Sequence, residues 1–518
     1  MKIRSIMKKR KCLNLPLRGC PRRGQEINKM SKIFRVHLSI VALVFLLIFF
    51  TCSGCKPGGD TTSQETPETN TEPEVEPTIG LLLNTDSACQ GYTLFAPKHY
   101  TTTYLIDNDG NLVHSWDQSQ YEPGQSVYLL ENGHLLRACF TNNSSFTGGG
   151  EGGRIEEYDW DGNLVWEFDY ANDEHLSHHD IEPLPNGNIL VLAVELKTDT
   201  ELMEAGFNPN MLREQKLYPD YVIEIEKVGS NSANIVWEWH VWDHLIQDYD
   251  RSKENYGTVA EHPELIDIHG MNRPIPAFWN HMNAIDYNAQ LDQIVLSVRG
   301  NSEIWIIDHS TTTREAAEHT GGLRGKGGDL LYRWGNPRTY GAGGTEDQTF
   351  FEQHDSQWIP PGCPGEGNIL VYNNGNNRLA GQYSSVDEII PPVDAFGNYT
   401  LPTGGEAFLP LQQVWIYTAE NPTDLFSEAI SGAQRLPNGN TLICDGTHGI
   451  FFEVTSSGEK VWHYVNPVVD TGPLTQGETP SLDVRGHNYN AVFKIHRYAP
   501  DYPGLAGRDL TPRGVIEL

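Results

Sequence analysis

Residues 184–192 read LPNGNILVL, and close copies of this stretch return along the chain. Asn-Gly tolerates the positive φ of a tight turn, and the alternating apolar residues after it are typical of a half-buried strand. The copies are LENGHL at 130–135, GEGNILVY at 365–372 and LPNGNTLIC at 436–444, with divergent members at 283–295 and 490–498. Six copies of one hairpin predict six repeated units.

A second phrase alternates with the first and places a turn before a strand that contains Trp. It reads DGNLVHSW at 109–116, DGNLVWEF at 161–168 and GEKVWHY at 458–464, with looser copies at 234–239 and 329–334. Helical periodicity is weak, and 311–319 is the best short helical candidate. Closing short strands into a circle removes exposed sheet edges, so the pattern predicts an all-β fold, a six-bladed β-propeller. A pair of β-sandwiches with coincidental turns is the alternative.

The charge of the chain is strongly negative but unevenly distributed. Its 518 residues hold 37 Lys and Arg against 68 Asp and Glu, for a net charge of −31. Such acidity argues against nucleic acid as a partner, because phosphate contacts need Lys and Arg. Residues 1–54 are nevertheless basic, with Glu26 as their only acid. The rest of the chain is therefore even more acidic than the total suggests.

The basic segment has the layout of an export signal. Residues 38–50 (LSIVALVFLLIFF) form an apolar run that is too short for a comfortable membrane span and precedes Ser-Gly-Cys at 53–55. We expect 1–54 to be a signal peptide, with Met30 as an alternative start. Cys55 would then be lipidated as the first residue of the mature protein. A plain cleaved signal is the alternative.

The residues after Cys55 predict a tether and then the propeller. Residues 55–79 are rich in Thr, Glu and Pro and should form a solvated, lipid-anchored acidic linker. The propeller would occupy 80–518. This order predicts an exported lipoprotein of a bacterial cell envelope, held at the membrane by its lipid anchor at the outer membrane or periplasmic face. Four cysteines remain in the propeller, and their three possible pairings stay open (Cys89, Cys139, Cys363 and Cys444).

The repeat also predicts which residues meet at the centre of the propeller. The innermost strand of each blade lines the central channel, so equivalent positions just before these strands should converge. All six are polar: Gln125, His179, His281, His354, Ser431 and Asn490. The three histidines could cap strands, hold zinc or copper, act as acid–base catalysts or carry a covalent group. No Cys or carboxylate ligand motif accompanies them, so we expect neither a metal nor a cofactor.

Three charged residues lie close to these histidines in the sequence. Arg378, at the end of NNGNNR (373–378), could return to the channel and hold a tetrahedral anion such as sulfate or phosphate. A surface ion pair is the alternative for Arg378. Asp180 and Asp355 directly follow His179 and His354. Adjacent side chains of a strand point in opposite directions, so neither Asp need orient its own His.

Several long motifs resemble the bacterial arylsulfate sulfotransferases. They are HMNAI (281–285), Arg299, QHD (353–355), NNGNNR (373–378) and GAQRLPNGNTLI (432–443). The runs SEIWIIDHS (302–310) and RYAPDYPGL (497–505) look like a lipoprotein subgroup usually grouped with this family. The resemblance covers about residues 80–512.

The resemblance implies that the protein moves a sulfuryl group from an aryl sulfate to a phenol through a sulfated histidine. The family uses no nucleotide sulfate donor, and this chain has no phosphate-cradling Gly loop. The expected nucleophile position in the fifth blade is Ser431 here. Either His448 or a ring histidine takes that role, or the reaction differs, as in a sulfatase-like hydrolysis or a transfer to another acceptor. The resulting catalytic candidates are His179, His281, His354, His448 and Arg378. The substrate-binding candidates are Gln125, Asn283, Arg299, Ser431 and Asn490.

A non-catalytic propeller is the alternative function. DGNLVW (161–166) resembles the tryptophan-docking repeat of quinoprotein-like propellers, some of which only scaffold envelope complexes. In that interpretation the channel histidines are structural.

Overall fold

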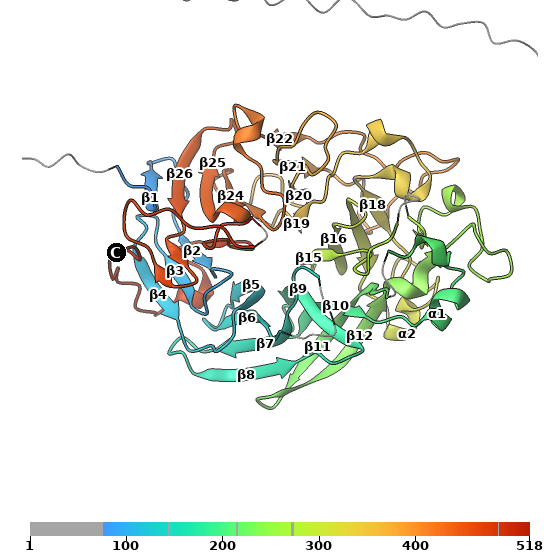
Figure 1. Ribbon diagram of the computed structural model, residues 1–518, viewed down its shortest axis with the longest axis horizontal. Coiled ribbons are helices and arrows are strands. Elements are labelled where there is room, and N and C mark those ends of the chain that lie inside the picture. The colour runs from blue at the N-terminus through green and yellow to red at the C-terminus, as the bar shows by residue number, and fades with distance from the viewer. Residues whose placement is uncertain (1–75, 143–145, 147, 214–215, 271–273, 485) are drawn as a thin grey trace, which may run out of the picture. The chain divides into compact units, whose positions relative to one another are not determined.

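Six antiparallel sheets surround a central axis, and consecutive sheets follow the order of the chain (Figure 1). This computed structural model describes residues 76–142, 146, 148–213, 216–270, 274–484 and 486–518. The expected signal peptide, Cys55 and most of the linker lie outside these residues. Within the described part of the chain, no helix is long and apolar enough to cross a membrane. The sheets confirm the predicted six-bladed β-propeller.

Each blade has four main strands, numbered here from the innermost outward. Blade 1 contains β29 (His496–Tyr498), β2 (Tyr92–Phe95), β3 (Thr103–Ile106) and β4 (Leu112–Trp116). Blade 2 contains β5 (Pro123–Leu129), β6 (Leu135–Phe140), β7 (Gly153–Tyr158) and β8 (Leu164–Asp169). Blade 3 contains β9 (His175–Pro183), β10 (Ile189–Glu195), β11 (Asp220–Val228) and β12 (Ser232–His240).

The other three blades repeat this plan. Blade 4 contains β15 (Met282–Asn288), β16 (Gln293–Val298), β17 (Glu303–Asp308) and β18 (Tyr332–Trp334). Blade 5 contains β19 (His354–Trp358), β20 (Ile369–Asn373), β21 (Ser385–Ile389) and β22 (Trp415–Tyr417). Blade 6 contains β23 (Gly432–Arg435), β24 (Thr441–Asp445), β25 (Ile450–Val454) and β26 (Lys460–Val465).

Both ends of the described chain help to close the ring. The N-terminal β1 (Gly80–Asn84) pairs with β26 as a fifth strand of blade 6, whereas the C-terminal β29 is the innermost strand of blade 1. Blades 6 and 1 are thus each built from both ends of the chain. The strands from the two ends therefore complete the two blades that meet where the ring closes.

The tryptophans of the second repeated phrase join each blade to the next. An indole N–H on an outer strand donates to a backbone carbonyl of the following blade, which satisfies both buried groups. The bonds run from Trp116 to Asp159, Trp166 to Ser232, Trp239 to Gly328, Trp334 to Pro410, Trp415 to Ser456 and Trp462 to Asn108. One recurring residue type therefore explains why the sheets associate as a ring.

A second set of contacts joins the inner strands. Asp180 accepts the backbone N–H of Ile285 at 3.2 Å, and Asp355 accepts that of Ala433 at 3.0 Å. Lys494 lies between these two carboxylates, 2.8 Å from Asp180 and 3.4 Å from Asp355. The aspartates that follow His179 and His354 thus bind the next blade and the central Lys494, as the alternation of strand side chains predicts.

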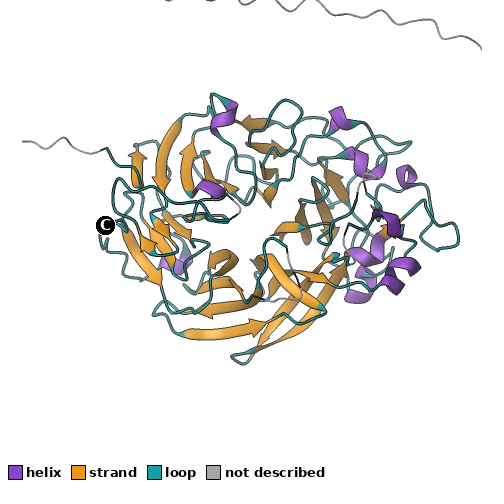
Figure 2. Cartoon of the chain, in the orientation of Figure 1, coloured by secondary structure: helices purple, strands orange, loops and turns teal. Residues whose placement is uncertain are grey.

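Shorter elements decorate the loops, and most helical turns gather on one side of the ring beside blade 4 (Figure 2). The α-helices are α1 (Asp199–Glu204) and α2 (Thr313–Ala316), which lies inside the predicted segment 311–319. Small two-stranded pairs are β13 (Leu245–Ile246) with β14 (Ile266–Asp267) and β27 (Val468–Val469) with β28 (Gly472–Pro473). The 3-10 helices are Pro209–Met211, Val241–His244, Val259–Glu261, Pro337–Tyr340, Thr345–Asp347, Pro422–Asp424, Gly446–His448 and Pro503–Leu505. The four propeller cysteines are free thiols.

Candidate active site

Four of the six predicted ring positions lie near the start of an inner strand, whereas His179 lies in the middle of β9 and Asn490 precedes β29 by six residues. Four of the six positions have positive φ, an uncommon conformation for residues other than glycine: Gln125 (109°), His179 (51°), His281 (50°) and Ser431 (86°). In blade 5 the same kink falls on the neighbours of His354, at Glu352 (58°) and Asp355 (51°). A shared backbone distortion therefore occurs within or just before five inner strands.

Histidines from blades 3, 4 and 5 lie near one another, and His179 and His354 each contact one phenyl ring. The ring centres of His179 and His281 are 4.8 Å apart. Phe493 lies 6.1 Å from His179 and 6.4 Å from His354. Gly150 covers His179 so closely that a Cβ there would come within 2.0 Å of the imidazole. Glycine is required at that position by this contact and by its φ of +78°.

The tautomer of His354 follows from its hydrogen bonds. The Asn374 amide nitrogen donates to the carbonyls of Ser427 and Ile430, so its Oδ1 faces His354 and accepts from Nδ1 at 2.7 Å. Nε2 then holds the lone pair, and it accepts the Ile430 backbone N–H at 3.2 Å. Burial, and next the charge of Arg299, lowers the pKa of His354 to about 3. The imidazole is neutral at neutral pH.

His179 is held at one nitrogen by a second histidine. Its Nδ1 lies 2.8 Å from Nδ1 of His178, and Nε2 of His178 lies 3.1 Å from a carboxylate oxygen of Asp220. One of the two Nδ1 atoms donates to the other, and Nε2 of His178 makes no hydrogen bond of its own with the described residues. Burial, followed by His281, keeps the pKa of His179 well below its ordinary value. Burial and then Arg299 do the same for His281.

The positive charge of the site comes from Arg299 and Lys98. Arg299 forms an ion pair with Glu352, and its charge helps to lower the pKa of both His281 and His354. Lys98 donates to Gln125 at 3.3 Å and contributes to the low pKa of His179 and His354. A cavity of about 280 Å³ is lined by Lys98, Gln125 and Gly150, among others. Two cations and neutral imidazoles suit an anionic tetrahedral group.

Arg378 and His448, both predicted to be catalytic, contact other parts of the protein. Arg378 packs against the rings of Phe351 and Tyr383, 5.2 and 4.3 Å from their centres, and donates to Ser385. The chain reverses at Gly375 (φ 81°), which carries Arg378 beside β21. Arg299 therefore replaces Arg378 as the guanidinium whose charge acts on the histidines. The His448 side chain is 44% exposed and bonds Asp445 at 2.9 Å, so the structure does not bring it into the group.

Three residues predicted to bind substrate are engaged by the protein itself. The Asn283 amide donates to the Gln353 carbonyl at 2.8 Å. Ser431 donates to the Ser427 hydroxyl, and the Asn490 amide donates to the Asn466 carbonyl. These bonds tie loops and inner strands together.

Sequence reasoning missed Lys98, Asp220, Phe493 and the role of His178. His178 stood beside a predicted residue, and that adjacency was the available signal. Lys98 lies between β2 and β3, outside both repeated phrases, and Phe493 belongs to the divergent sixth copy. Asp220 starts the third strand of blade 3, and only its contacts with His178 and with the Met282 backbone N–H show that it reaches the histidines.

Comparisons with known proteins identify two curated relatives. The chain is 22% identical over 378 residues to the arylsulfate sulfotransferase AssT of Escherichia coli O6:H1, covering 68% of this chain and 58% of that protein. It is 22% identical over 368 residues to AssT of Lelliottia amnigena, covering 66% and 56%. The chain thus spans a little over half the length of these curated relatives.

A likeness to solved structures is weaker. A protein of unknown function from Bacteroides caccae has a TM-score of 0.41 at 13% identity, covering 79% of this chain and 99% of that one. No functional inference follows from that value. The family model described as Arylsulfotransferase (ASST) matches residues 66–470. The chain belongs to the arylsulfotransferase (ASST) family.

Proposed function

We propose that the protein transfers a sulfuryl group from an aryl sulfate to a phenol, with His354 as the carrier. The observation that carries this proposal is a group of neutral imidazoles beside two cations. A nitrogen nucleophile needs a free lone pair, and burial keeps the pKa of His354 at about 3. The substrate needs positive charge for its sulfate, which Arg299 and Lys98 supply.

His354 has the arrangement expected of an oriented nucleophile. Asn374 holds its Nδ1 proton, which leaves the lone pair on Nε2. The contact of Nε2 with the Ile430 N–H is long at 3.2 Å, and the sulfur atom would replace it. The N–H would then be available to a sulfuryl oxygen. Ile430 is β-branched with a φ of 47°, a strained conformation of the kind that clusters at functional sites.

The proposed cycle balances in two steps. Nε2 of His354 attacks the sulfur of the aryl sulfate, the bond from sulfur to the aryl oxygen breaks, and the phenolate takes a proton from His281. The acceptor phenol then attacks the sulfur, gives its proton back to His281 and releases His354. Binding of the sulfate anion raises the pKa of His281, so His281 takes up a proton from solvent before the first step and is the imidazolium that protonates the phenolate.

The direct test is the release of dye from p-nitrophenyl sulfate or methylumbelliferyl sulfate with and without phenol. Release that depends on phenol supports transfer, and release without phenol indicates hydrolysis. His354→Ala should lower the rate by about 10³-fold or more, as loss of a nucleophile does, while His448→Ala serves as the matched control. Mass spectrometry of enzyme quenched without acceptor should find the added sulfuryl group on the peptide containing His354. Its presence on His179 instead would contradict the assignment.

We also propose that Cys55 anchors the protein to the cell envelope. The support is the apolar run at 38–50 followed by Ser-Gly-Cys, then the Thr- and Glu-rich tether. Metabolic labelling with a palmitate analogue should mark the wild-type protein. A Cys55→Ser variant that still carries the label would contradict lipidation at this position.

A further inference from the structure

A second group of histidines lies away from the channel, in the segments that follow blade 3 and precede β18. His244 ends a 3-10 helix, and His319 and Asp329 flank the loop that leads to β18. Nδ1 of His244 is 2.9 Å from Asp329 Oδ1, and Nδ1 of His319 is 2.7 Å from the same oxygen. One ligand atom from each residue lies within 4.8 Å of the other two. These three residues are named the blade 3–4 cluster.

The hydrogen bonds of the blade 3–4 cluster place two hydrogen-bond acceptors opposite each other. Nε2 of His244 lies 2.8 Å from the Ala316 carbonyl and must donate its proton there, because a carbonyl only accepts. In a neutral ring the lone pair is then on Nδ1. That lone pair faces a carboxylate oxygen at 2.9 Å, so two acceptors oppose each other in a buried place. Either a cation or an extra proton must lie between them.

We propose that a divalent cation of the zinc type binds the blade 3–4 cluster through His244 Nδ1, His319 Nδ1 and Asp329 Oδ1. Two imidazoles and one carboxylate are a common protein ligand set for zinc, with bonds of about 2.0–2.2 Å and a further position for water or another ligand. A metal-binding histidine usually donates its other N–H to a carbonyl or carboxylate, as His244 does to Ala316. The sequence spacing offered no ligand motif, because the three residues come from separate loops.

The surroundings fix His244 and leave His319 accessible. The His244 ring stacks on Trp239 at 5.7 Å with an interplanar angle of 8°. Gly328 passes so close that a Cβ there would lie 2.5 Å from Nε2 of His244. The His319 side chain is 60% exposed and would complete the site from the solvent side. A bound ion would therefore link the loop after α2, which carries His319, to His244, which follows blade 3.

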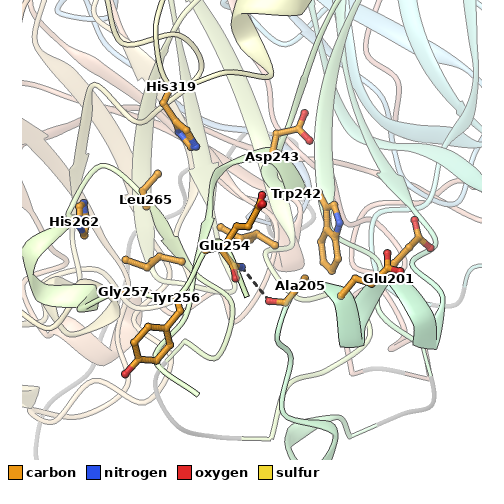
Figure 3. A pocket seen from close by; sticks show the side chains of 14 residues that line it. Glu201, Ala205, Trp242, Asp243, Glu254, Tyr256, Gly257, His262, Leu265 and His319 are labelled. Carbon is orange, nitrogen blue, oxygen red and sulfur yellow. Dashed lines mark hydrogen bonds between the residues drawn. The ribbon is translucent and has the colours of Figure 1, made fainter. Parts of the chain in front are cut away.

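The exposed side of the blade 3–4 cluster meets an acidic cavity. This cavity has a volume of about 560 Å³, and His319 is one of its lining residues. Figure 3 shows His319 at the same cavity as Glu201, Asp243 and Glu254. Carboxylates along the approach raise the local concentration of cations. The remaining coordination position of the ion would face this side.

The test is zinc binding by protein first stripped with a chelator, measured by competition with a chromophoric chelator. Wild-type protein should take up one equivalent, and cobalt substitution should give the visible bands of a low-symmetry site. His319→Ala should lower the affinity by at least about 10–100-fold, the range seen when even a supporting partner of a ligand is lost. Because the His319 side chain is exposed, we expect this variant to fold as the wild type does. Zinc should also raise the thermal midpoint of the wild type but not of His319→Ala.

His448→Ala is the matched control, because His448 is also exposed and also bonds an Asp, at 2.9 Å. This variant should bind zinc as the wild type does. Stripped wild-type protein that binds no zinc would overturn the proposal and identify the blade 3–4 cluster as an imidazolium–carboxylate group. Binding that survives His319→Ala unchanged would overturn it as well.

Discussion

The histidines of the channel and those of the outer edge of blades 3 and 4 are mostly buried, yet their protonation is opposite. Burial and nearby cations lower the pKa of His354 to about 3. His309, which lies 2.8 Å from Asp292 and 3.0 Å from Glu224, has its pKa raised to about 9 although burial opposes this. His240, between Glu195 and Glu238, has its pKa raised to about 9 as well.

The difference between these regions shows that the channel keeps unengaged carboxylates away from its histidines. This protein carries 68 acidic residues, and a histidine with two carboxylate neighbours becomes a cation. In the channel, Asp180 and Asp355 are engaged with Lys494 and the next blade, and Glu352 with Arg299. The three channel histidines are therefore neutral, and the positive charge resides on Arg299 and Lys98. A nucleophilic imidazole requires that separation.

The largest expected effect is a difference in kcat/KM between the Arg299→Ala and Arg378→Ala variants. Arg299→Ala should lower kcat/KM for sulfuryl transfer by about 10²–10³-fold, the loss typical of removing one charge-stabilising donor. Arg378→Ala should change it by less than about threefold, because that guanidinium packs against Phe351 and Tyr383. Initial rates with p-nitrophenyl sulfate and phenol measure both. Equal losses of kcat/KM in the two folded variants would show that Arg378 also acts in the reaction.

The next largest expected effect is a lower free energy of unfolding in His309→Ala, at the outer edge of blades 3 and 4. His309→Ala removes the cation between Asp292 and Glu224 and leaves two carboxylates facing each other. We expect a loss of about 3 kcal/mol in the free energy of unfolding, as for other buried pairs that lose one partner. Urea unfolding followed by tryptophan fluorescence measures it. A loss below about 1 kcal/mol would mean that His309 is not charged in the folded protein.

The pH dependence of stability should have opposite signs for the two regions. The pKa of His354 is about 3 when folded and about 6.5 when unfolded, so its contribution is complete above pH 6.5 and is lost as the pH falls toward 3. The contribution of His309 is complete below pH 6.5 and is lost as the pH rises through about 9. Each accounts for a slope of at most about 1.4 kcal/mol per pH unit.

Replacement by glutamine separates the two pH effects. His354→Gln should flatten the acid side of the stability profile, and His309→Gln should flatten the alkaline side. Unfolding free energies measured from pH 4 to pH 9 test both. A flattening on the opposite side for either variant would reverse the assigned protonation state.

The smallest effect should come from His448. Its side chain is 44% exposed and pairs with Asp445, so His448→Ala should change the free energy of unfolding by less than about 0.5 kcal/mol. The transfer rate should also stay the same. A large loss of rate without unfolding would place His448 in the reaction after all.

The fold and the ring of polar positions were predictable because both follow from repetition. A turn-and-strand phrase with three Asn-Gly copies and three more divergent ones has a similar conformation wherever it occurs, and the Trp phrase marks the outer strands. The positions before each inner strand could therefore be aligned without knowing any contact. The surroundings of Arg378 could not be predicted in this way: it follows a strand in sequence, and the turn at Gly375 places its guanidinium against Phe351 and Tyr383.

The sequence by itself determined the number of blades, the family and the three histidines that meet in the channel. These depend on local turn chemistry and on motifs that are continuous in the chain. Only the tertiary structure decided which nitrogen of His354 holds the lone pair, which arginine lies by the histidines, and that His244, His319 and Asp329 meet. Protonation and ligand geometry depend on neighbours from other blades, within a few ångströms, and no pattern along the chain encodes that distance.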